Sequence, residues 1–115
     1  MRVAFEIPGK PVAKQRARTV NGHTYTPPKT RAYEEAVAWR SRGMGSFDEP
    51  VKVAITLSSR TSLRGDIDNY AKSILDGIVK GELIRDDILI EHLVVTKLPN
   101  GESDGVWVVV ESISD

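Results

Sequence analysis

The sequence predicts a single α+β domain over residues 1–115, in which two helices cover a mixed or antiparallel sheet of about four or five strands. Three observations favour this class. The chain has 115 residues, 40% of them hydrophobic and 28% charged, which suits one globular core. Two segments carry apolar residues at helical spacing, and other segments alternate apolar and polar residues as strands do. No internal repeat indicates a different architecture.

The first half of the chain is expected to form a strand, a hairpin and a helix. Residues 2–7 alternate in polarity and end at Pro8-Gly9, as a short strand would. Asn21-Gly22 is the strongest short hairpin signal, because both residues tolerate positive φ. Residues 30–42 predict the first helix, with Thr30 as the expected N-cap. Its expected core-facing stripe consists of Ala32, Tyr33, Ala36, Val37 and Trp39.

The second half is expected to form a strand, a helix and a C-terminal hairpin. Alternation over 51–57 predicts a half-buried strand, and apolar spacing over 68–80 predicts the second helix. Strands are expected around 89–97 and 106–113, with a tight turn between them. Trp107 lies in the last of these strands, and we expect it in the core.

Composition limits the cellular setting and the chemistry. The chain has no cysteine, so it has no disulfide framework, thiolate metal site or cysteine nucleophile. Its longest apolar run, Val106 to Val110, is far too short for a transmembrane helix. We therefore expect no membrane partner and a cytoplasmic location. The net charge is zero, yet residues 1–42 hold nine basic and three acidic groups, which favours a polyanion-binding surface beside an acidic site.

The most informative segment surrounds the start of the second helix. Asp66 and Asp68 are two residues apart, so in an extended entry to the helix their carboxylates point the same way while Ile67 turns toward the core. Lys72 follows Asp68 by four residues, so one helical turn brings its ammonium near this pair.

A later acidic pair, Asp86-Asp87, could join the first. The helix over 68–80 carries the chain about 18 Å away, and six further residue steps can span roughly 20 Å, which is enough to return. Three or four carboxylates meeting there would form a hard oxygen site for one or two Mg²⁺ ions, with Mn²⁺ as a substitute. On spacing alone, the candidate ligands are Asp66 and Asp68 together with either or both of Asp86 and Asp87.

Ordinary structural roles are the alternative for each of these residues. Asp68 could be only a helix N-cap, and Asp86-Asp87 could be only a turn. Lys72 could form a surface ion pair with Asp68 or with Asp76. A cap does not require a second acidic pair one helix further along, and this second pair favours the metal-site interpretation.

These residues resemble the RusA family of Holliday junction resolvases. The family pattern is Asp-x-Asp-Asn-x-x-Lys, then a helix with an Asp, then a paired Asp-Asp; its counterparts here are Asp66-Ile67-Asp68-Asn69, Lys72, Asp76 and Asp86-Asp87. Two N-terminal blocks, Ile7 to Val12 with the cations after it and Tyr25 to Glu34, are also similar to members of this family. The resemblance covers nearly the whole chain.

The resemblance implies a RusA-like fold and a homodimeric, metal-dependent endodeoxyribonuclease that resolves four-way junction DNA by paired symmetric cleavage in recombination and repair. It implies that Asp66, Asp68 and Asp87 bind the metal and that Lys72 is the catalytic lysine. We expect cationic side chains to contact backbone phosphates with little sequence reading. These are Lys10, Lys14, Arg16, Arg18 and Arg64.

Two departures from the family pattern leave alternatives open. The loop before Asp66 has only Arg60 and Arg64 where family members often have a longer arginine run, and Leu89 replaces a frequent glutamine. A less selective nuclease for flaps or forks is therefore one alternative. The other is a non-catalytic DNA-binding module whose acidic groups serve as caps and ion pairs.

Overall fold

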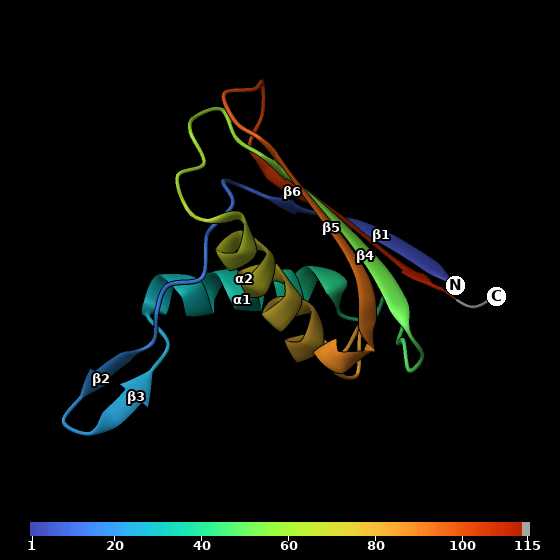
Figure 1. The fold of residues 1–115 in the computed structure, drawn as a ribbon, viewed down its shortest axis with the longest axis horizontal. Coiled ribbons are helices and arrows are strands. Elements are labelled where there is room, and N and C mark those ends of the chain that lie inside the picture. The colour runs from blue at the N-terminus through green and yellow to red at the C-terminus, as the bar shows by residue number, and fades with distance from the viewer. Residues whose placement is uncertain (114–115) are drawn as a thin grey trace.

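The computed structural model describes residues 1–113 and confirms the predicted α+β class. Two helices and one 3₁₀ turn are joined to a four-stranded sheet and a separate hairpin (Figure 1). In chain order the elements are β1 (Arg2–Pro8), β2 (Arg18–Val20), β3 (His23–Tyr25), α1 (Pro28–Ser41), β4 (Val51–Ser58), α2 (Ile67–Lys80), η1 (Asp87–Leu89), β5 (Ile90–Leu98) and β6 (Gly105–Ser112).

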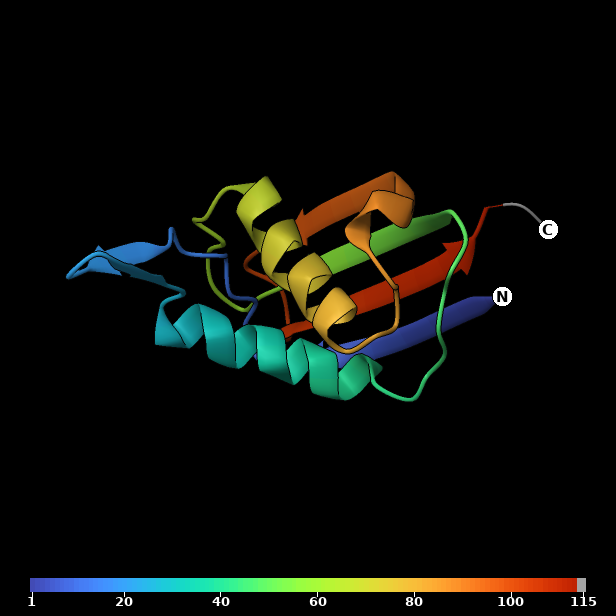
Figure 2. The same ribbon diagram turned by 90° about the horizontal axis from the view of Figure 1, so that it is seen from below.

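The sheet is mixed, with the strand order β1-β6-β4-β5. β6 is antiparallel to both β1 and β4, whereas β4 and β5 are parallel. The predicted C-terminal hairpin is therefore wrong, because β5 and β6 lie on opposite sides of β4 and do not pair with each other. Parallel neighbours need a crossover connection, and α2 provides it. As a result, α2 begins near the end of β4 and the chain returns to the opposite end of the sheet before β5 starts (Figure 2).

Both helices cover one face of the sheet, and the core lies between the helices and this face (Figure 2). Alternate side chains of each central strand point into this core, because successive residues of a strand face opposite sides. Its fully buried members include Ile7, Val53, Ile55, Leu57, Ile74, Ile78, Val106 and Val108. Among residues 1–113, no helix is long and apolar enough to cross a bilayer.

The packing of α1 corrects two sequence predictions. The helix begins at Pro28 rather than Thr30, since proline fits the first helical position, and the Thr30 hydroxyl instead accepts a hydrogen bond from the Gln15 amide (3.0 Å). Its buried side includes Val37 and Ala38, so Trp39, the next residue around the helix, is 74% exposed rather than in the core. Ala32 and Ala36 are exposed as well.

Two further predictions of burial are wrong. Trp107 is 50% exposed, because Val106 and Val108 occupy the core-facing positions of β6 and strand alternation turns the residue between them to the uncovered face. Ile67 is 44% exposed. It lies on the same helical stripe as the buried residues Ala71 and Ile74, but it is the first residue of α2, where little of the core remains to cover it.

The hairpin formed by β2 and β3, which we call the arm, projects from the body of the protein (Figures 1 and 2). Its turn uses Asn21 and Gly22, with φ values of 51° and 79°, as the sequence predicts. All its strand residues are exposed. The arm is therefore held by its own turn and ladder rather than by the core.

Candidate active site

The carboxylates of Asp66 and Asp68 lie at the N-terminal end of α2. Asp66 occupies the N-cap position with extended backbone, but its side chain accepts no capping hydrogen bond; its carbonyl oxygen accepts the Asn69 and Tyr70 amides instead (3.0 and 3.2 Å). Asp68 lies in the first turn, so the alternative that it is the N-cap is wrong. Both residues are exposed, and within residues 1–113 neither carboxylate has a hydrogen-bond or ion-pair partner.

The backbone before Asp66 is fixed by close packing. A Cβ on Gly65 would lie 2.8 Å from the Ala13 Cβ and 3.1 Å from the Tyr70 ring, so only glycine fits. Lys97 donates hydrogen bonds to the carbonyl oxygens of Leu63 and Gly65 (3.1 and 2.6 Å), and its ammonium lies 5.4 Å from the Tyr70 ring centroid. Sequence reasoning did not single out Lys97, because its contacts are with residues far from it in the sequence.

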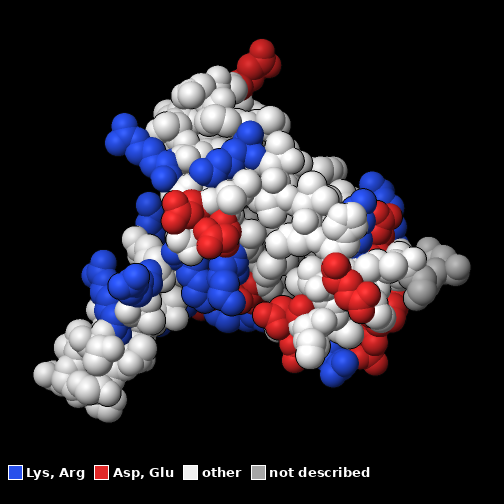
Figure 3. Space-filling view, in the orientation of Figure 1, with Lys and Arg blue, Asp and Glu red and all other residues white. Residues whose placement is uncertain are grey.

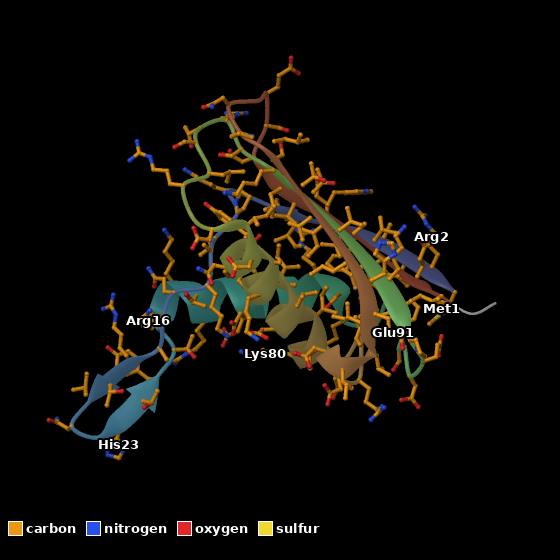
Figure 4. All side chains as sticks on the ribbon, in the orientation of Figure 1. Met1, Arg2, Arg16, His23, Lys80 and Glu91 are labelled. Atoms are coloured by element: carbon orange, nitrogen blue, oxygen red, sulfur yellow. The ribbon has the colours of Figure 1, made fainter. Side chains whose placement is uncertain are left out.

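Beside Asp66 is an open groove of about 1090 Å³, which we call the basic groove. Three of the predicted DNA-contacting cations, Lys10, Lys14 and Arg64, line it. Arg16 lies between the body and the arm, and Arg18 begins the arm (Figure 4). The full lining is Lys10 to Gln15, Lys29, Thr61, Ser62, Arg64, Gly65, Asp66, Asn69 and Tyr70.

Lys14 makes internal ion pairs. Its ammonium contacts the Asp76 carboxylate and lies 3.2 Å from the buried Glu34 carboxylate. Partial burial by itself lowers the pKa of Lys14, but hydrogen bonds and charge attraction from Asp76 and Glu34 outweigh it, so the pKa lies above its ordinary value. Lys14 therefore joins the N-terminal segment to α1 and α2, and its predicted contact with phosphate stays a prediction.

Lys72 lies one turn beyond Asp68 on α2. Its ammonium is 3.9 Å from Asp76 Oδ1 and forms no ion pair with Asp68. Of the two partners considered from the sequence, the structure thus selects Asp76. The Lys72 side chain remains 57% exposed.

Asp86 and Asp87 lie at η1, just before β5. The Asp86 side chain accepts the Ile88 amide at 3.0 Å, so it serves as the N-cap of η1. This bond, together with one from Asp87, lowers the pKa of Asp86. Asp86 thus has a local structural role of the kind that the alternative gave it, whereas the expected role of the pair in binding a metal stays a prediction.

The fold separates the two acidic pairs within one chain. After α2 the chain passes the segment that precedes β4. There the Phe47 amide donates a hydrogen bond to the Leu83 carbonyl oxygen (2.8 Å), and Phe47 and Ile84 form an isolated parallel β-bridge. η1 then lies beside the C-terminal half of α2, whereas Asp66 and Asp68 are at its other end (Figures 1 and 2). Accordingly, no group of three acidic or histidine side chains in the described part of one chain is placed to hold a metal ion.

Comparison with known proteins identifies the family. Residues 8–111 match the family model described as endodeoxyribonuclease RusA, which is most of the chain. The chain belongs to the RusA endodeoxyribonuclease family. A relative from Aquifex aeolicus (strain VF5), named crossover junction endodeoxyribonuclease RusA, is 30% identical over 104 residues, which are 87% of this chain and 82% of the relative.

Membership in the RusA family makes the chain a phosphodiester hydrolase and supports a junction-resolving endonuclease. RusA nucleases are metal-dependent and act on branched DNA. This membership does not support the alternative of a non-catalytic DNA-binding module.

The surface charge around α2 suits such a nuclease. Figure 3 shows a small acidic patch over the N-terminal end of α2, bordered by Lys and Arg side chains, and a second acidic group toward η1 and the start of β5. Carboxylates alone would repel a polyanion, and neighbouring cations offset that repulsion. The first patch therefore combines oxygen ligands for a cation with charge that attracts a phosphate backbone.

Proposed function

We propose that this protein is a Mg²⁺-dependent RusA endonuclease that resolves four-way junction DNA by two symmetric phosphodiester cleavages. One observation carries the proposal: the carboxylates of Asp66, which lines the basic groove, and of Asp68, in the first turn of α2, are exposed and unpaired within the described chain. Within the described residues no hydrogen bond or ion pair accounts for either carboxylate, although Asp68 also suits the positive end of the helix dipole. A DNA substrate is also consistent with the cytoplasmic location that we expect from the sequence.

The residues present suit a hard divalent cation. Asp66 and Asp68 would supply carboxylate oxygens, the ligand type that Mg²⁺ and Mn²⁺ prefer, and neither has to release an existing ion pair first. When bound, the metal lowers the pKa of a water molecule and neutralises phosphoryl charge. A metal at a helix N-terminus opposes the helix dipole, so additional carboxylates are needed to favour it.

A second copy of the chain would provide them. Asp87, with Asp86 beside it, cannot approach Asp66 without rearranging the β4-α2-β5 crossover, because α2 alone spans roughly 20 Å. In a two-fold homodimer each chain can offer its η1 to the other, and both sites become complete together. Two related sites also match the approximate two-fold symmetry of a four-way junction.

The other charged residues would bind and orient the DNA. The exposed Lys72 ammonium, one helical turn beyond Asp68, would stabilise charge that develops on the phosphoryl oxygens. Lys72 is not assigned as a general base. The cations that line or border the basic groove would contact backbone phosphates; they are Lys10, Lys14, Arg16, Arg18 and Arg64.

A nicking assay on a synthetic mobile junction, with and without Mg²⁺, tests the proposal. We expect Mg²⁺-dependent paired nicks, and we expect Asp68→Asn to abolish them while gel-shift binding of the junction persists. Glu35→Gln, which neutralises an exposed carboxylate on α1, is the matched control and should nick normally. Equal nicking by Asp68→Asn and the natural protein would exclude the metal site.

The small number of arginines in the loop before Asp66 favours a second candidate, a less selective nuclease for flaps and forks. Only Arg60 and Arg64 lie in this loop, and the backbone amide and Nε of Arg60 are bonded to Asp104 and Glu102. Comparing cleavage of four-way, three-way and linear duplex DNA separates the two candidates. Preference for the four-way substrate by tenfold or more supports the resolvase.

A further inference from the structure

Four charged side chains form a row of ion pairs that links three segments of the protein. Lys14 belongs to the N-terminal segment, Glu34 to α1, and Asp76 and Lys72 to α2. Glu34 is buried, and Lys14 and Asp76 are half-buried. Ion pairs of this kind are sensitive to loss of one member, because the remaining charges are left without their partner.

The two lysines share Asp76 unequally. Lys14 hydrogen-bonds to Asp76 Oδ2 and also to Glu34, whereas Lys72 lies 3.9 Å from Asp76 Oδ1, beyond hydrogen-bond range. Lys72 precedes Asp76 by four residues, and a direct contact at this spacing is easily reached by a change of side-chain rotamer. Lys14 therefore already satisfies the carboxylate that would otherwise attract Lys72.

We propose that Lys14 is a positioning residue that neutralises Asp76 and Glu34 and so keeps the Lys72 ammonium available to the phosphate being cleaved. This inference rests on the proposed function, in which Lys72 acts on the DNA. It assigns Lys14 a role beyond phosphate contact, and it makes Asp76 a competitor for Lys72 when Lys14 is absent.

The backbone of this segment is anchored independently of the Lys14 ammonium. The Lys14 amide donates to the Asn69 carbonyl oxygen (2.8 Å), and the Ser73 hydroxyl donates to the Val12 carbonyl oxygen (2.7 Å). Lys14→Met should therefore keep the segment on α2 and remove only the charge. Asp76 and Glu34 would then lack a cation, and Lys72 is the lysine already within an ion-pair distance of Asp76.

The experiment compares Lys14→Met, Asp76→Asn and the double variant in single-turnover nicking at saturating enzyme, with junction affinity measured separately. We expect Lys14→Met to slow nicking about tenfold, which is about 1.4 kcal/mol in the barrier, with no more loss of affinity than one phosphate contact accounts for. The double variant should recover most of the rate, because the competing carboxylate is gone. Lys80→Met, an exposed charge loss in the last turn of α2, is the control (Figure 4).

Two outcomes would overturn the proposal. Weaker junction binding at an unchanged rate would make Lys14 only a DNA contact. A double variant no faster than Lys14→Met would show that Asp76 does not compete for Lys72. In a Lys72→Ala background, Lys14→Met should cause no further loss of rate, whereas a purely structural role would still lower it.

A readout without DNA separates this inference from the proposed function. The rate at which acetic anhydride modifies Lys72, followed by mass spectrometry, should fall in Lys14→Met and recover in the double variant, because an ion-paired amine reacts more slowly. Unchanged Lys72 reactivity would contradict the inference even if the enzyme nicks junctions. Absence of nicking by the natural protein would refute the proposed function while this reactivity comparison still tests the ion-pair competition.

Discussion

Gly65 immediately precedes Asp66, and its lack of a side chain sets the position of that carboxylate. In Gly65→Ala the new Cβ would lie 2.8 Å from the Ala13 Cβ and 3.1 Å from the Tyr70 ring, where ordinary contacts are 3.4–4 Å. The backbone must therefore shift by several tenths of an ångström or more. Because Lys97 holds the Gly65 carbonyl oxygen, we expect this shift to be transmitted to Asp66.

Two opposing effects determine the stability of Gly65→Ala. Overpacking costs about 1–3 kcal/mol, and replacing glycine returns roughly 0.4–1 kcal/mol by restricting the unfolded chain. The net loss is about 1–2 kcal/mol, which for a chain of 115 residues is a fall in Tm of roughly 4–8 °C. Misplacing a reacting group by about 1 Å can slow chemistry a hundredfold, so we expect nicking to slow by tenfold or more.

Calorimetry and single-turnover nicking measure both effects, and a compensating substitution sharpens the test. Ala13→Gly removes the atom that the new Cβ would meet, so Ala13→Gly/Gly65→Ala should recover part of the Tm and most of the rate. Gly101→Ala is the control, since its Cβ would have no neighbour closer than 3.8 Å. If Gly65→Ala melted and nicked like the natural protein, the packing argument for Asp66 would be refuted.

Three further predictions concern binding, helix packing and pH. Arg16→Ala with Arg18→Ala should weaken junction binding and reduce the slope of log affinity against log salt by about 1.8, measured by gel shift; an unchanged slope would remove both residues from the interface. Gly77→Ala should destabilise the protein in urea by about 1–2 kcal/mol despite better helix propensity, because its Cβ would lie 2.5 Å from the Val37 Cβ; greater stability would contradict the observed helix contact. The raised pKa of Lys14 means that its stabilisation is complete below about pH 10.4 and lost as pH rises through the folded-state pKa. The stability difference between the natural protein and Lys14→Met should therefore stay constant up to about pH 10.4 and shrink above it, and a difference that stays constant above that pH would argue against the ion pairs.

Local patterns predicted most of the fold. Alternation in β1 and β4 identified the core-facing side chains, and Asn21-Gly22 identified the arm, because these signals depend on neighbouring residues only. α1 was harder to orient. Its alanines and aromatic residues suit more than one buried face, and the choice depends on the close approach of Val37 to Gly77 on α2.

The candidate site was predicted only where it is local. The spacing of Asp66 and Asp68 placed both at the start of α2, but chain length could not show which way the chain returns afterwards. The parallel pairing of β4 with β5 decides that question: β5 must start at the end of the sheet where β4 starts, which takes η1 away from Asp66. Strand direction is a property of the whole sheet, so no local motif reveals it.

The arm differs from the rest of the molecule in what limits its sequence. A change of volume in the core disturbs several neighbours, whereas all six strand residues of the arm are exposed and fill no space among other side chains. Only the turn geometry and the electric charge are constrained there. Homologues can consequently lengthen, shorten or recharge this projection at little thermodynamic cost, which makes it the part of the chain where substrate preference can diverge fastest.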